Sequence, residues 1–162
     1  MPDTIGKLIS RLMAEDKEMI AYRPKLNRIT GSVLASVLLQ QANYRFVNNG
    51  EQPFYKFRAP CKHALYRPGD SWTEELGFSG DEFDSALKRI GTKIVAGTSK
   101  AEALKKTDPT GLVLYWTDSN RVTWYLVNVE LLGNLAFPHY LEKGESLSTL
   151  RSGKAELPLV QR

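Results

Sequence analysis

Residues 71–91 constrain the fold of this chain more than any other stretch, because two helix starts lie eight residues apart within them. Ser71 is followed three residues later by Glu74, and Ser79 is followed in the same way by Glu82. Each Ser–Glu pair has the spacing of a capping box, in which both side chains bind unpaired backbone N–H groups at a helix N-terminus. The pattern therefore predicts two capped helices that meet at a very short joint.

The joint and the second helix have the pattern of a helix-turn-helix. Gly77 can adopt the positive φ that a sharp turn needs, and Phe78 can place its ring between the two helices. The second helix carries one apolar stripe at i, i+3, i+4 and i+7, formed by Phe83, Ala86, Leu87 and Ile90. Such a unit commonly lays its second helix in a DNA major groove, but helical corners also occur in domains that bind no nucleic acid.

Length and composition indicate one soluble globular domain. The 162 residues can bury a core without disulfides, and 42% of them are apolar and 25% charged. No apolar run approaches the roughly 20 residues of a membrane helix, and the N-terminus lacks a signal-peptide pattern. The single cysteine, Cys61, cannot form an internal disulfide, and we expect it to be a small packing residue. These features predict a cytoplasmic protein with no membrane partner.

Charge is unevenly distributed along the chain. The net charge of +4 at pH 7 favours acidic partners only mildly. Residues 52–69 contain basic side chains and no acid, whereas residues 70–84 contain acids and no base. The basic residues are Lys56, Arg58, Lys62 and Arg67, and the acidic residues are Asp70, Glu74, Glu75, Asp81, Glu82 and Asp84.

The N-terminal half predicts two long helices and a strand. Residues 5–15 have the apolar spacing of an amphipathic helix, which could close the core or bind a second copy of the chain; we favour core packing. Residues 30–48 predict the central helix, capped by Thr30 or Ser32. Residues 53–57 predict a strand, and an irregular basic loop follows at residues 59–70.

The C-terminal half predicts a β-hairpin. Residues 112–117 and 122–129 are rich in β-formers and are separated by a polar turn, which is the clearest hairpin signal in the chain. Before it, residues 92–96 are a candidate strand and residues 99–106 a candidate helix.

A closing segment at residues 131–137 is expected to end at Pro138. We therefore divide the chain into a domain at residues 1–138 and a flexible tail or linker at residues 139–162.

Four segments, taken in order, resemble winged-helix proteins of bacteriophages, plasmids and integrated mobile elements that are described as replication-initiation-like or DNA-binding. They read ITGSVLASVLLQQANYRF, FYKF, SWTEELGFSGDEFDSALKRIGTKI and LVLYWTDSNRVTWYLVN. The resemblance covers roughly residues 20–132 and depends on pattern and order. It implies an α+β fold, a winged helix-turn-helix with an extra N-terminal helix and a C-terminal β-hairpin wing. The helix after Ser79 would face the major groove, and the hairpin would lie along the backbone or in a minor groove.

Double-stranded DNA is accordingly the expected main partner. Base contacts are expected from Ser85, Lys88, Arg89 and Lys93, with Arg121 at the hairpin tip reaching a groove. Phosphate contacts are expected from Lys56, Arg58, Lys62 and Arg67, together with Lys100, Lys105 and Lys106.

Signatures of catalysis, cofactors and metals are missing from the sequence. There is no phosphate-binding loop motif, and the two histidines, His63 and His139, are far apart in the chain. Cys61 and His63 are close in sequence, but a zinc site needs further ligands that the sequence does not offer at the usual spacing. We therefore predict a protein that is not an enzyme, with no cofactor and no metal.

Two functions from different classes follow. The first is a DNA-binding protein of a phage or mobile element that acts in replication initiation or transcriptional regulation. The alternative is a protein-binding winged-helix module whose acidic face at residues 70–84 docks on a basic protein groove. A second copy of the chain, as a homodimer, and a replication or regulatory protein are further candidate partners.

Overall fold

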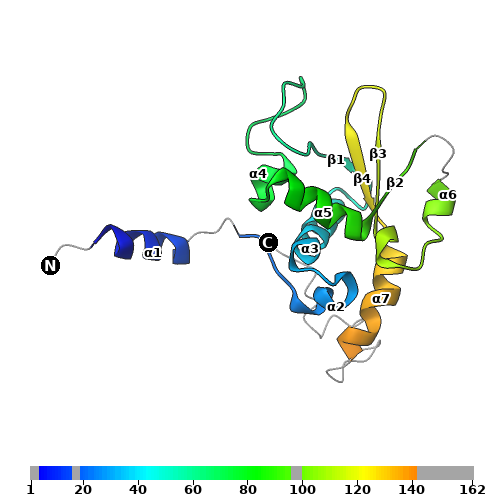
Figure 1. Cartoon of the computed structure of the whole chain (residues 1–162), viewed down its shortest axis with the longest axis horizontal. Helices are drawn as coiled ribbons and strands as arrows, with labels where there is room; N and C mark the ends of the chain where they lie inside the picture. The colour runs from blue at the N-terminus through cyan, green and yellow to red at the C-terminus, as the bar shows by residue number, and fades with distance from the viewer. Residues whose placement is uncertain (1–3, 16–18, 96–99, 142–162) are drawn as a thin grey trace.

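The computed structural model describes residues 4–15, 19–95 and 100–141 of the chain. Within these residues the chain combines helices with a four-stranded sheet, so the predicted α+β class is confirmed (Figure 1). None of the helices in these ranges is both long enough and apolar enough to cross a bilayer.

The sheet has the strand order β1-β4-β3-β2. Strands β3 (Val113–Thr117) and β4 (Thr123–Val127) form the predicted antiparallel hairpin. Strand β1 (Phe54–Tyr55) pairs antiparallel with the free side of β4, with Phe54 opposite Tyr125. Strand β2 (Gly91–Lys93) runs parallel to β3 at the other edge of the sheet. The hairpin is thus flanked on both sides by short strands from earlier in the chain.

The tip of the hairpin is organised by Asp118. Its carboxylate accepts hydrogen bonds from the backbone N–H groups of Asn120 (2.8 Å) and Val122 (3.0 Å) and from the indole N–H of Trp124 (2.9 Å). Arg121 has a φ of 60°, in the left-handed region that residues other than glycine rarely adopt. Because three donors share one carboxylate, the backbone that carries Arg121 is held in one conformation.

Helix α3 (Val33–Asn48) is the central helix, as the sequence predicts. Ser32 caps it by accepting a hydrogen bond from the backbone N–H of Ala35 at 3.3 Å. It is preceded by a short 3-10 helix (Pro24–Leu26) and by α2 (Asn27–Thr30), which ends at Gly31 with a φ of 69°. The buried positions of α3 are Ala35, Ser36, Leu38, Leu39, Gln40, Gln41, Ala42, Asn43 and Phe46.

Helices α4 (Trp72–Leu76) and α5 (Gly80–Ile90) confirm the prediction for residues 71–91. Both capping boxes are formed. Each cap serine side chain accepts a hydrogen bond from the backbone N–H of its glutamate, and each glutamate side chain accepts one from the backbone N–H of its serine. Gly77 ends α4 with a φ of 69°, and Phe78 packs against the core. The joint between the helices therefore sets the direction in which α5 leaves α4.

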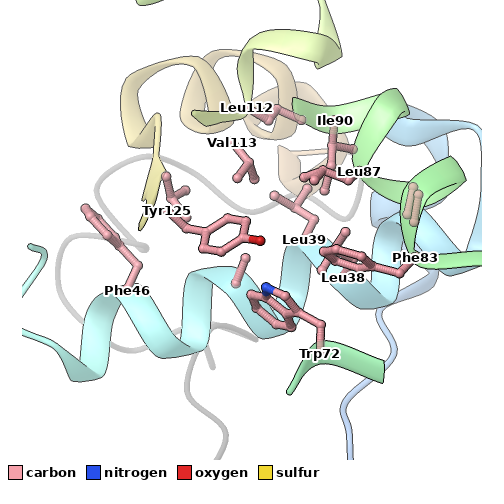
Figure 2. Close-up of a cluster of buried hydrophobic side chains, with 14 of the residues drawn as sticks. Leu38, Leu39, Phe46, Trp72, Phe83, Leu87, Ile90, Leu112, Val113 and Tyr125 are labelled. Carbon is pink, nitrogen blue, oxygen red and sulfur yellow. The ribbon is translucent and has the colours of Figure 1, made fainter. Parts of the chain in front are cut away.

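The core lies between α3, the α4–α5 pair and the hairpin. Figure 2 shows Trp72 and Phe83 stacked beside Leu38, with Tyr125 of β4 pointing toward Trp72. The ring centroids of Trp72 and Phe83 are 6.0 Å apart, and those of Trp72 and Tyr125 are 5.5 Å apart. Burial raises the pKa of the Tyr125 hydroxyl. Packing of these rings anchors α5 on the sheet.

Helix α7 (Val129–Leu141) corrects the expected end of the closing segment. Pro138 lies inside this helix and does not end it. The proline removes the N–H that would bond to the carbonyl oxygen of Asn134, and the helix continues beyond it to Leu141. The helix also crosses the predicted boundary between residues 138 and 139, and the rest of the predicted tail, residues 142–162, lies outside the described residues.

Helix α6 (Lys100–Ala103) is shorter than the predicted helix at residues 99–106. Its first expected residue and the last residue of the candidate strand at 92–96 fall in the range 96–99, outside the described residues. From residue 104 the chain turns toward a 3-10 helix (Pro109–Gly111), whose N-terminus is capped by the side chain of Asp108.

Helix α1 (Ile5–Glu15) is helical as predicted, but it does not close the core. None of its residues is buried, and Figure 1 shows it apart from the body formed by the other helices and the sheet. The interpretation of this helix as a core element is therefore wrong. The apolar spacing identified the face correctly but carried no information about what would cover it.

Candidate nucleic-acid interface

The exposed side of α5 carries Ser85, Lys88 and Arg89, three of the predicted DNA contacts. Lys88 follows Asp84 by one helical turn, so both lie on the same side of the helix. Arg89 is turned toward α2, where its Nη1 donates to the carbonyl oxygen of Thr30 at 3.4 Å. The two cations at the end of α5 therefore diverge, and Arg89 borders the corner between α2 and α3.

Arg58, predicted as a phosphate contact, pairs with Asp84 of α5. Its Nε and Nη2 donate to Oδ1 and Oδ2 of Asp84 at 2.8 and 2.9 Å. This bond is the main cause that lowers the pKa of Asp84 below its ordinary value. Both side chains keep about half of their surface exposed, 49% for Arg58 and 55% for Asp84. The pair joins the end of the β1 segment to α5 without hiding the cation.

Lys56 cannot contact phosphate as predicted, because it is buried. The residue is only 4% exposed, and its ammonium donates to the backbone oxygen of Asp70 at 2.7 Å and to Oδ1 at 3.1 Å. It also lies 5.1 Å from the centroid of a Trp72 ring, and burial is the main cause that lowers its pKa. The alternation of this strand segment places Phe54 and Lys56 on the same, inward side. The sequence predicted the strand but not this charged residue on its buried face.

The acidic residues at 70–84 are largely used within the fold. Glu74 accepts hydrogen bonds from the hydroxyl groups of Ser71 and Tyr66, each at 2.6 Å, and from the backbone N–H of Gly69 at 2.7 Å. The bonds from Ser71 and Tyr66 are the largest causes that lower the pKa of Glu74 to about 2. Four other carboxylates in the run also have partners, namely Asp70, Glu75, Glu82 and Asp84.

The basic loop at residues 59–70 lies against the hairpin tip. The backbone N–H of Leu65 donates to Nδ1 of His63 at 3.0 Å, so Nε2 is assigned as the donor to the carbonyl oxygen of Asn120 at 2.8 Å. The ring of His63 lies 5.0 Å from that of Phe57. Figure 1 shows the loop between β1 and α4 and the tip of the β3–β4 hairpin at the same end of the molecule. Exposed cations at this end are Lys62, Arg67 and Arg121.

No sequence pattern indicates this contact between the loop and the hairpin. The acceptor on the hairpin is a backbone carbonyl group, which every residue carries, so nothing in the sequence distinguishes Asn120 as the partner of His63. The pair of Arg58 and Asp84 had a weak signal, because the two residues lie in neighbouring segments of opposite charge.

Other predicted contacts lie away from the loop and the hairpin tip. Lys93 is exposed at the end of β2, opposite Tyr115 of β3. Lys100, Lys105 and Lys106 are exposed in and after α6, which Figure 1 places beyond β2, at the edge of the sheet opposite β1. The predicted DNA contacts thus divide into a group near the loop, hairpin tip and α5 and a second group near α6.

Cys61 is a free, exposed cysteine, so the expectation that it packs in the core is wrong. The described ranges contain no group of three or more His, Cys, Asp or Glu side chains that could hold a metal ion.

Comparison of the chain with protein-family models, with curated proteins and with solved structures found no match.

Proposed function

We propose that the chain binds double-stranded DNA through a winged helix-turn-helix formed by α3, β1, α4, α5, β3 and β4. The order of elements supports this, since a helix, a strand and a close helix pair precede a hairpin whose second strand pairs with β1. In this proposal α5 enters the major groove and the β3–β4 hairpin is the wing.

One observation carries the proposal: a single short segment contacts both α5 and the hairpin tip. Arg58 binds Asp84 of α5, and His63, five residues later, binds the backbone of Asn120 at the tip. Because the basic loop joins the two elements, a DNA backbone beside it would meet cations from all three. These cations are Lys62, Arg67, Lys88 and Arg121.

The charges of the acidic run favour DNA over a basic protein groove as the partner. Five of the six carboxylates at residues 70–84 already have hydrogen-bond or ion-pair partners within the fold. A basic protein surface would have to compete with these partners for the carboxylates. A role in replication initiation or transcriptional regulation of a phage or mobile element is part of the proposal and follows from the resemblance described above.

A salt titration tests the proposal. A labelled duplex of mixed sequence is titrated with the full chain at several salt concentrations, and binding is followed by fluorescence anisotropy. If four cations each contact one phosphate, log K should fall against log salt with a slope of roughly −3 to −4. Absence of binding at low salt, or a slope near zero, would overturn the proposal.

Two double variants locate the interface. Lys62→Gln with Arg67→Gln removes two charges from the basic loop, and Lys105→Gln with Lys106→Gln removes two charges near α6. The first variant should weaken binding and reduce the slope by about 2, whereas the second should change the slope little. Equal effects of the two would show that binding reflects net charge and not the surface proposed here.

A further inference from the structure

The backbone of Arg58 is held by the first turn of α4. The carbonyl oxygen of Phe57 accepts from the N–H of Trp72 at 2.9 Å, and that of Arg58 accepts from the N–H of Thr73 at 3.0 Å. The backbone of Arg58 is therefore fixed beside the first turn of α4. From there its side chain reaches Asp84 on the exposed side of α5.

Asp84 uses only part of the guanidinium. An arginine carries five N–H donors, and the paired bonds to Asp84 use the one at Nε and one of the two at Nη2. Nη1 has no hydrogen-bond partner among the residues that the structure describes, and the side chain is 49% exposed. The edge formed by Nη1 and Nη2 therefore keeps unused donors on two neighbouring nitrogens.

Gly80 brings the guanidinium close to the backbone of α5. A Cβ atom at this position would lie 2.5 Å from Nη2, 3.1 Å from Cζ and 3.2 Å from Nη1 of Arg58, so any larger residue would displace the side chain. Gly80 is the first residue of α5. The guanidinium thus rests on the first turn of the helix that the proposed function places in the major groove.

We propose that Arg58 determines specificity by binding a guanine base in the major groove, and that Asp84 and Gly80 position it. This inference rests on the proposed function. Two adjacent donors on a planar group match the O6 and N7 acceptors of guanine. The carboxylate of Asp84 stands next to the free donors and repels a phosphate, whereas the edge of a base carries no net charge. The free edge of the Arg58 guanidinium therefore suits a base better than the DNA phosphate that the sequence predicts as its contact.

Selection of binding sites from a randomised duplex library tests the inference with the full chain. The DNA sequence selected by the wild-type chain should contain a guanine that the Arg58→Lys variant does not require. Lysine keeps the positive charge but lacks the paired donors of arginine. Replacing that guanine by 7-deazaguanine, which lacks the N7 acceptor, should weaken wild-type binding by roughly tenfold and leave Arg58→Lys unchanged. Arg67→Lys is the matched control and should retain the guanine preference, because Arg67 lies on the basic loop and forms no ion pair with a carboxylate in the part of the chain that the structure describes.

Gly80→Ala provides a test that changes no charge. Alanine is a good helix former, so α5 should persist, while the new Cβ displaces the guanidinium of Arg58. This variant should lose the guanine preference while keeping its affinity for mixed-sequence DNA. If the pair of Arg58 and Asp84 served only to hold the loop in place, DNA binding would not depend on N7 of one guanine.

The outcomes separate this inference from the proposed function. Failure of the wild-type chain to bind any duplex at low salt would overturn both. Binding without a guanine preference, or equal losses on 7-deazaguanine for wild type and Arg58→Lys, would overturn only the role of Arg58.

Discussion

Helices α1 and α5 have the same length, eleven residues, and the same apolar spacing, yet only α5 is buried along its stripe. Phe83 and Ile90 of α5 are 1% and 0% exposed, whereas Ile5 and Leu12 of α1 are 78% and 63% exposed. The comparison shows that periodicity determines which face of a helix is apolar, and that the neighbouring segments determine whether the face is covered.

The segments that precede the two helices differ. Helix α5 follows a glycine turn and a complete capping box, and the short joint to α4 directs it onto α3 and the sheet. At the start of α1, Thr4 accepts one hydrogen bond from the backbone N–H of Lys7 at 3.3 Å, and the first turn has no acidic residue. A short, well-capped connection therefore carries tertiary information that an amphipathic pattern does not.

Core truncation should produce the largest difference between the two helices. Phe83→Ala should lower the free energy of unfolding by about 3–5 kcal/mol, because it removes a fully buried ring from the core. Leu12→Ala in α1 should change it by less than about 0.5 kcal/mol, since Leu12 is largely exposed. Chemical denaturation of both variants measures the difference. A loss above 2 kcal/mol for Leu12→Ala, as a rough threshold, would show that α1 packs on the body in solution.

Removal of the helix caps should produce a smaller difference in the same direction. Ser79→Ala should cost about 1 kcal/mol of unfolding free energy, because the backbone N–H of Glu82 loses its acceptor. Thr4→Ala removes the corresponding acceptor at α1 and should leave global unfolding unchanged, since that helix contributes no buried residue. Thermal unfolding curves compare the two variants. Equal shifts in Tm would contradict the difference drawn between the helices.

The effect of pH through Glu74 of α4 should be the smallest of the three and has no counterpart in the first turn of α1, which contains no acidic residue. The folded pKa of Glu74 is about 2, below the ordinary value of 4.5, so its stabilising contribution is complete above about pH 4.5. That contribution is lost as the pH falls toward the folded pKa. Glu74→Gln should therefore be less stable than wild type near pH 6, and the difference should shrink on acidification. Denaturant unfolding at pH values from about 6 downward measures the difference in unfolding free energy between the two proteins. A difference that does not change with pH would show that the charge of Glu74 is not its cause.

Much of the fold was predictable because local signals and global packing agree. The capping boxes at Ser71 and Ser79, the glycine turn at Gly77 and the hairpin all appear where the sequence places them. Each depends on interactions within a few residues, which a sequence displays directly. The extent of α7 was not predictable from Pro138, because a proline usually ends a helix but here lies inside it.

The candidate site was less predictable because it depends on contacts between distant segments. Lys56 and Arg58 look alike in the sequence, and strand alternation would place them on the same face. Strand β1 ends at Tyr55, however, and after it Lys56 is buried whereas Arg58 is half exposed. The contact of His63 with the hairpin uses a backbone carbonyl group, and the pair of Arg58 and Asp84 spans 26 positions. Such contacts follow from topology, which the periodicity of a single chain does not specify.

The central claim is that α5, the basic loop and the hairpin tip face one DNA duplex together. NMR titration of the isotopically labelled full chain with a short duplex tests it most directly. The account predicts that backbone amide shifts change around Ser85 and Lys88, at Lys62 and Arg67, and at Asn120 and Arg121, with little change in α6 and α7. Shift changes confined to α6 or α7, or no change at low salt, would contradict it.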